Sequence, residues 1–97
     1  MPLRRLVLDV LKPIKNPGIE ELALRLESAP GVRGVNITVK EVDVETLTLV
    51  IVIEGDDINL DEVRSRLDEF GAVIHSIDQV VAGEKVVEVP PFYEEVQ

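Results

Sequence analysis

The chain contains no cysteine and no tryptophan, and aromatic residues make up only 3% of its 97 residues. The absence of cysteine excludes disulfide bonds, thiolate metal sites and cysteine nucleophiles. The shortage of aromatic side chains argues against a surface on which the bases of a single-stranded nucleic acid stack. No apolar run approaches the ~18 residues of a membrane span and no signal peptide is recognisable, so we expect a cytoplasmic protein.

Positive charge is also scarce. Ten lysines and arginines stand against nineteen aspartates and glutamates, which gives a formal net charge of -9. Such a chain repels the phosphate backbone of a nucleic acid and the anionic surface of a membrane, so we expect neither partner. With 45% hydrophobic and 30% charged residues the composition is that of a globular protein, and the length suits one domain.

Four segments have the pattern of β-strands, because aliphatic residues recur at every second position in them. The segments are residues 3–12, 32–42, 46–53 and 72–82. The first and third are unusual in carrying aliphatic residues on both faces.

Two segments between these strands have apolar residues at helical spacing. The first is expected to begin at Pro17 after a cap by Asn16, and to stop at Pro30. The second is expected to follow a cap by Asn59 and to end at Gly71.

The element order β-α-β-β-α-β predicts an α+β, ferredoxin-like fold. In this fold a four-stranded antiparallel sheet has the spatial order 4-1-3-2, and two helices cover one face. We expect residues 1–89 to form the single domain, with residues 85–89 extending the sheet, and residues 90–97 to form a mobile tail.

The other face of the sheet is predicted to mediate self-association. Val7, Leu11, Val50 and Val52 fall on the face that the helices do not cover. A contiguous aliphatic patch on a small protein usually marks an interaction surface, so we expect a homo-oligomer held by this face, by an edge strand, or by both. In the alternative, the C-terminal segment with Val86, Val87 and Val89 folds over the same face.

The densest acidic cluster contains Asp56, Asp57 and Asp61, beside Asn59 and Glu62. Calcium and magnesium prefer several oxygen ligands, so these carboxylates are candidate ligands for a divalent cation. Carboxylates at the start of a helix also cap it and compensate its dipole, which explains the same cluster without a metal.

His75, the only histidine, is expected opposite the region around Asp9 and Val10 on the neighbouring strand. A pair formed by Asp9 and His75 would raise the pKa of the imidazole and could shuttle protons. In the alternative, His75 is a buried or interfacial side chain with one hydrogen bond. No serine or threonine nucleophile can be placed beside it, so no catalytic triad is predicted.

The loop Lys15-Asn16-Pro17-Gly18 is similar to the turn that joins the first strand and helix in ACT-type regulatory domains. Those domains share the βαββαβ order and commonly bind amino acids at subunit interfaces. Backbone donors at the helix start, assisted by Lys12 or Lys15, could hold a carboxylate. Lys15, Asn16, Gly18 and His75 are therefore the candidate ligand-binding residues.

Four segments carry a more specific resemblance. They are Arg4-Arg5-Leu6-Val7-Leu8-Asp9-Val10-Leu11-Lys12-Pro13, Gly34-Val35-Asn36-Ile37, Ile53-Glu54-Gly55-Asp56-Asp57, and Val73-Ile74-His75-Ser76-Ile77-Asp78 with Val81-Ala82-Gly83. In sequence and order they resemble a small archaeal family, the domain of unknown function 211. The resemblance implies a ferredoxin-like fold and ring-like homo-oligomers, and it implies no activity. Asp9, Asp56, Asp57, His75 and Asp78 are the motif residues with chemistry to offer.

The sequence thus predicts a self-assembling, non-enzymatic protein that binds a divalent cation or a small anionic ligand between subunits. The alternative is an ACT-like regulatory module that binds an amino acid or small metabolite and docks on a partner protein. A small enzyme using His75 with an acidic partner is the third candidate.

Overall fold

The computed structural model describes residues 2–91 and contains all six predicted elements in the predicted order. Their bounds are β1 Leu3–Pro13, α1 Ile19–Glu27, β2 Val32–Val42, β3 Thr46–Gly55, α2 Leu60–Glu69 and β4 Val73–Ala82. No helix within residues 2–91 is long and apolar enough to cross a membrane.

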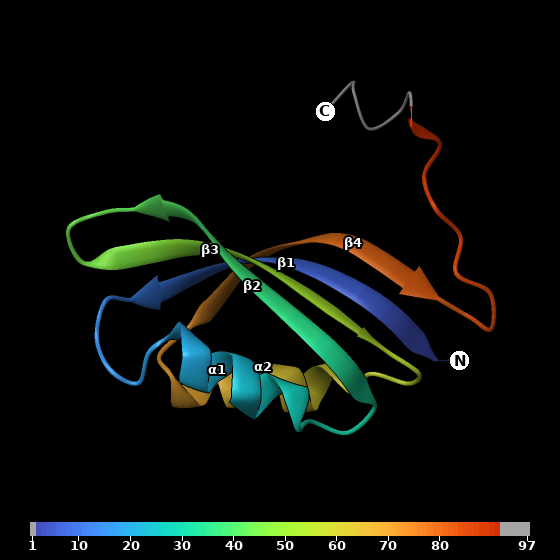
Figure 1. The fold of residues 1–97 in the computed structure, drawn as a ribbon, viewed down its shortest axis with the longest axis horizontal. Coiled ribbons are helices and arrows are strands. Elements are labelled where there is room, and N and C mark those ends of the chain that lie inside the picture. Colours follow the sequence, from blue (N-terminus) through green and yellow to red (C-terminus); the bar gives the residue numbers. More distant parts are fainter. Residues whose placement is uncertain (1, 92–97) are drawn as a thin grey trace.

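The four strands form one antiparallel sheet in the order β2-β3-β1-β4, which is the predicted order 4-1-3-2 counted from the other edge. Both helices lie on the same side of this sheet (Figure 1). Each helix connects two strands that are consecutive in the sequence but are separated in the sheet by one other strand, as the crossover connections of this topology require. The predicted α+β, ferredoxin-like fold is confirmed.

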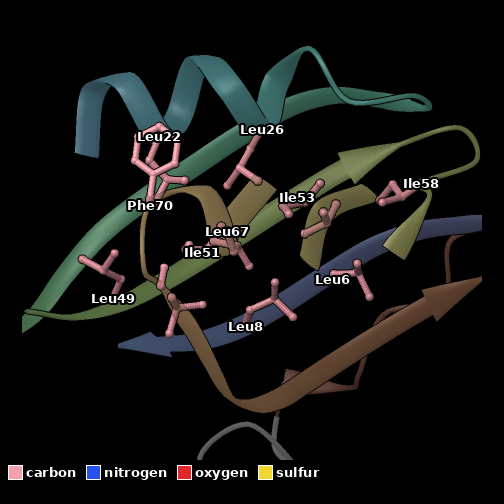
Figure 2. Close-up of a cluster of buried hydrophobic side chains, with 13 residues drawn as sticks. Leu6, Leu8, Leu22, Leu26, Leu49, Ile51, Ile53, Ile58, Leu67 and Phe70 are labelled. Atoms are coloured by element: carbon pink, nitrogen blue, oxygen red, sulfur yellow. The ribbon is translucent and has the colours of Figure 1, made fainter. Parts of the chain in front are cut away.

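The hydrophobic core lies between the helices and the inward face of the sheet (Figure 2). Every second residue of the two central strands points into it, and none of these side chains is more than 1% exposed. The inward residues are Leu6, Leu8 and Val10 of β1, and Leu49, Ile51 and Ile53 of β3. Leu22 and Leu26 of α1 pack on them together with Val63 and Leu67 of α2.

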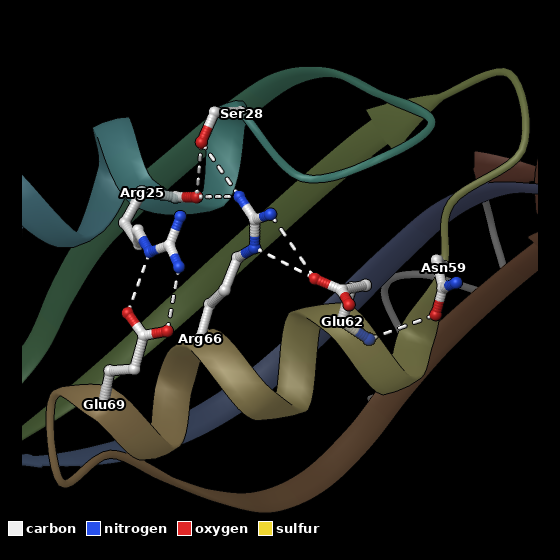
Figure 3. A network of polar contacts seen from close by, with 6 residues as sticks. All are labelled: Arg25, Ser28, Asn59, Glu62, Arg66 and Glu69. Atoms are coloured by element: carbon white, nitrogen blue, oxygen red, sulfur yellow. Dashed lines mark hydrogen bonds and ion pairs between the residues drawn. The ribbon is translucent and has the colours of Figure 1, made fainter.

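The two helices are also joined by polar contacts on their outer side (Figure 3). Arg25 of α1 donates two hydrogen bonds to the carboxylate of Glu69, at 2.8 and 2.9 Å, and these bonds lower the pKa of Glu69. Arg66 of α2 donates to the carbonyl oxygen of Arg25 and to Ser28 Oγ, both at 2.9 Å. Each surface contact stabilises little by itself, but together they fix how the helices lie beside each other.

One predicted helix cap is confirmed and the other is wrong. Asn59 caps α2, since its Oδ1 accepts a hydrogen bond from the backbone N–H of Glu62 at 3.1 Å. Asn16 does not cap α1, which begins at Ile19 with Gly18 at the N-cap position and no side-chain cap. The carboxylate of Glu20 folds back to the place that a side chain at Gly18 would occupy. An acidic residue of the first turn therefore faces the helix start in place of Asn16.

Residues 83–91, which we call the C-terminal arm, leave the sheet. The predicted extension of the sheet over residues 85–89 is wrong, because β4 ends at Ala82 and these residues form no strand. Gly83 turns the chain with a φ of 107°, and Arg4 Nη1 holds the turn through the carbonyl oxygens of Gly83 and Glu84. The arm then rises on the side opposite the helices (Figure 1). Of the predicted mobile tail, residues 92–97 lie outside the described residues.

Two glycines bring the loop after β3 against the turn after α1. Gly31 has a φ of 82°, and a Cβ there would overlap the carbonyl group of Asp57. A Cβ at Gly55 would overlap the carbonyl oxygen of Gly31. The backbone N–H of Asp56 donates to that same oxygen at 3.1 Å. The loop after β3, which carries Asp56 and Asp57, is therefore held in place by close backbone contacts.

We expect Gly31→Ala to lower the free energy of unfolding by at least about 1–2 kcal/mol, because alanine is strained at this φ and has no room beside Asp57. Gly34→Ala is the matched control, because nothing lies within 4 Å of a Cβ at that position. Urea unfolding followed by circular dichroism measures both variants. Equal losses of stability would contradict the close approach at Gly31.

Candidate functional site

The side of the sheet opposite the helices, which we call the open face, carries aliphatic side chains on both central strands. Val7 of β1 is paired with Val52 of β3, and Asp9 is paired with Val50. These four side chains are partly exposed, and Leu11 is 37% exposed. The inward-facing residues in the middle of the same strands are fully buried. The helices therefore cover the aliphatic side chains on only one of the two faces that carry them.

Asp9 places a carboxylate in the middle of this aliphatic surface. Its Oδ1 is inaccessible to water and has no hydrogen-bond partner among the described residues, although the residue as a whole is partly exposed. Ser76, its neighbour on β4, donates its hydroxyl hydrogen bond to Asp78 Oδ1 at 2.7 Å instead. A buried oxygen without a partner costs about 1–3 kcal/mol, so a donor or cation arriving at the open face would be stabilised there.

The structure does not pair Asp9 with His75. The register between β1 and β4 shifts at this point, so that Asp9 lies opposite Ser76 and Val10 lies opposite Ile74. His75 falls at the resulting irregularity and is exposed at the sheet edge. Since a regular ladder has no such extra residue, the alternation of the sequence could not indicate it.

The three predicted cation ligands are placed separately. Asp56 forms an exposed ion pair with Arg33 at 3.1 Å, Asp57 lies in the loop after β3, and Asp61 lies in the first turn of α2. Within residues 2–91 no three histidine, aspartate or glutamate side chains converge as a metal site. A calcium or magnesium site shared between copies stays a prediction.

The predicted ligand residues Lys15, Asn16 and Gly18 do come together, in a pocket of about 320 Å³ at the start of α1. Lys12 also lines this pocket and is only 1% exposed. Its ammonium group donates to the carbonyl oxygens of Pro13, at 3.2 Å, and Lys15, at 3.0 Å. Within the described chain no carboxylate forms an ion pair with it.

His75 is not among the residues that line this pocket. The burial of Lys12 follows from the alternation of β1, because Lys12 continues the inward series after Val10. The alternation in the sequence could therefore have identified Lys12 as a buried residue, and the structure adds that it lines this pocket.

At the other end of the open face, the C-terminal arm returns to the sheet through one ion pair. Arg5 Nε donates to Glu54 at 2.7 Å, and its two terminal nitrogens donate to the two carboxylate oxygens of Glu88 at 2.9 Å. These hydrogen bonds lower the pKa of Glu88 and raise the pKa of Arg5. Sequence reasoning missed Glu88, because no local pattern links residues 83 positions apart.

Comparison with known proteins places the chain in a family. The family model described as "Uncharacterized ArCR", which is the domain of unknown function 211, matches residues 4–96. The chain belongs to this family. One relative of this chain is "Uncharacterized protein MJ0319" of Methanocaldococcus jannaschii, which is 48% identical to it over 86 residues. These residues cover 89% of this chain and 88% of the relative. The predicted family is confirmed, and neither description names an activity.

We expect the pKa of Glu88 to lie below the ordinary glutamate value of about 4.3. Arg5→Met should return it to that value, because the hydrogen bonds from Arg5 are the main cause of the shift. Arg33→Met is the matched control, because Arg33 pairs with Asp56 and not with Glu88. Carboxyl-carbon NMR titration measures the pKa.

Because the pKa of Glu88 is lower in the folded chain than in the unfolded chain, the attachment of the arm contributes to the free energy of unfolding at pH values above the unfolded pKa. This contribution is lost as the pH falls through the lowered value. An unchanged Glu88 titration in Arg5→Met would show that the arm is not held by Arg5.

Proposed function

We propose that the protein is the repeating subunit of a closed homo-oligomer, in which the open face of each copy lies against another copy. The observation that carries this proposal is the Asp9 carboxylate, which has an unpartnered, water-inaccessible oxygen amid partly exposed valines. An exposed aliphatic patch usually marks a contact surface, and a carboxylate within it needs a donor or cation from whatever covers the patch. Other copies of the same chain are present in any solution of the protein and can make this contact.

The edges of the sheet support the same proposal. β2 and β4 each have a neighbour on one side only, so both present free backbone groups. Both also expose aliphatic side chains: Val39 and Val42 on β2, and Val73, Ile77 and Val80 on β4. Contact between unlike edges of successive copies generates a ring when the rotation closes. The irregular pairing of β4 with β1 disfavours a continuous ladder of backbone hydrogen bonds between β4 and a second copy. Side-chain contacts are then the main source of affinity between copies.

We expect Val50→Glu to dissociate the oligomer, because it places a charge in the middle of the open face. Light scattering should give the wild type a mass that is a multiple of 10.8 kDa and the variant a mass near 10.8 kDa. The control is Val44→Glu, the same change at a residue that is 90% exposed in the turn between β2 and β3. It should assemble as the wild type does.

Circular dichroism must show that both glutamate variants remain folded. A wild type that stays at 10.8 kDa over micromolar to millimolar concentrations would overturn the proposal.

A second candidate function is the binding of a small carboxylate, such as an amino acid, in the pocket lined by Lys12. Support comes from the buried ammonium of Lys12, which neighbouring carbonyl oxygens hold without a counter-charge, and from the convergence of Lys15, Asn16 and Gly18. Buried cations usually have an anionic partner. Because Glu20 already faces the helix start, recognition would depend on Lys12 and Lys15 more than on the helix dipole. Such a module would act as an ACT-like sensor.

We expect at least one free amino acid or small di- or tricarboxylate, in millimolar excess, to raise the melting temperature of the wild type. A ligand that binds only the folded form must do so. Lys12→Met should abolish the shift, whereas Lys40→Met, which removes an exposed lysine of β2, should retain it. A shift that survives in Lys12→Met would place the ligand elsewhere.

A further inference from the structure

The C-terminal arm offers a surface that its own subunit does not use. We propose that the side of the arm carrying Lys85, Val87 and Val89 docks on the open face of a second copy, with the Lys85 ammonium against the Asp9 carboxylate. This inference rests on the proposed self-association and names the segment that performs it.

One side of the arm is committed to its own sheet. The carboxylate of Glu88 accepts two hydrogen bonds from Arg5, and Val86 lines a pocket of about 290 Å³ together with Arg4 and Arg5. Val86 and Glu88 both lie against Arg5 of the sheet. The arm is thus pinned by its root at Arg4 and by Glu88.

Lys85 and Val87, which alternate with Val86 and Glu88, form what we call the bare side of the arm. Val87 is 67% exposed, whereas Val86 and Val89 are exposed to a similar, smaller extent, 36% and 37%. Lys85 is exposed as well, and it forms no ion pair or side-chain hydrogen bond with any described residue. The arm as a whole rises on the open-face side of the sheet, the side on which a second copy would lie in the proposed assembly (Figure 1).

The open face is complementary to the bare side of the arm in both charge and polarity. The Asp9 carboxylate on this face has one oxygen without a hydrogen-bond partner among the described residues, and Val7 and Val50 lie beside it. The arm carries one unpaired ammonium, that of Lys85, with Val87 two residues away. Bringing the two surfaces together neutralises a partly buried carboxylate and removes both sets of valines from water.

Other occupants fit the open face less well. A nucleic acid or an anionic membrane would meet the carboxylate of Asp9 on a chain of net charge -9. The arm of the same chain is attached at the Arg5 end of this face, through Glu88 and not through Lys85. The arm of a second copy is free of that constraint.

Charge reversal tests the pairing between copies. Lys85→Glu alone should weaken self-association roughly tenfold or more, because two carboxylates then meet in the contact, and Asp9→Lys should do the same with two ammonium groups. A 1:1 mixture of the two variants should regain the wild-type mass, because each arm then finds an opposite charge on the other protein. The double variant Asp9→Lys/Lys85→Glu should assemble alone. Sedimentation velocity over a concentration series gives the association constants.

The controls separate this inference from the proposal on which it rests. Arg64→Glu also replaces a cation by a carboxylate, at an exposed residue of α2 on the helix side of the sheet that forms no ion pair with any described residue, and it should leave association within about twofold of the wild type. If Asp9→Lys fails to fold, Asp9→Asn with Lys85→Gln replaces it in a double-mutant cycle, whose coupling must be non-zero. An assembled wild type whose reversed variants do not recover on mixing overturns the arm contact alone. A monomeric wild type overturns self-association itself.

Discussion

The structure depends on a mismatch between a sheet that is apolar on both sides and a helix layer that covers only one. β1 and β3 lie in the middle of the sheet, and their inward residues are buried to 1% exposure or less under α1 and α2. The outward residues of the same strands, Val7, Val50 and Val52, are only partly buried. Antiparallel sheets with one solvated face usually alternate apolar and polar residues. The middle of these strands departs from that alternation, because valines stand where polar residues would be usual.

Two charged residues of β1 show the same asymmetry at the level of single atoms. Lys12 points inward, and its ammonium group is held by two carbonyl oxygens, so burial is compensated within the chain. Asp9 points outward, and its Oδ1 is just as inaccessible to water but has no hydrogen-bond partner in residues 2–91. Buried polar atoms are nearly always paired in complete structures. The unpaired atom lies on the side of the sheet that lacks a second layer.

The fold could be predicted because its signals are local. Strand alternation, helical spacing and the cap at Asn59 each extend over a few residues, and all of them agree with one topology. The features that were missed are a side-chain position, a strand irregularity and a long-range ion pair. The carboxylate of Glu20, and not the side chain of Asn16, lies at the start of α1, a register shift separates His75 from Asp9, and Arg5 binds Glu88 across the sheet. None of these contacts changes the hydrophobic pattern, so the pattern could not reveal them.

In the proposed assembly, the acidic balance of the chain limits where copies can meet. With a net charge of -9, copies repel one another over distances of about a Debye length, ~8–10 Å in ordinary salt. A stable contact must therefore be apolar and must offset its own carboxylates locally. At one end of the open face Arg5 already pairs with Glu54 and Glu88, whereas the central Asp9 has an oxygen without a partner among the described residues. In the proposed contact the partner supplies a positive charge to Asp9, and Lys85 of the arm is exposed and forms no ion pair with any described residue.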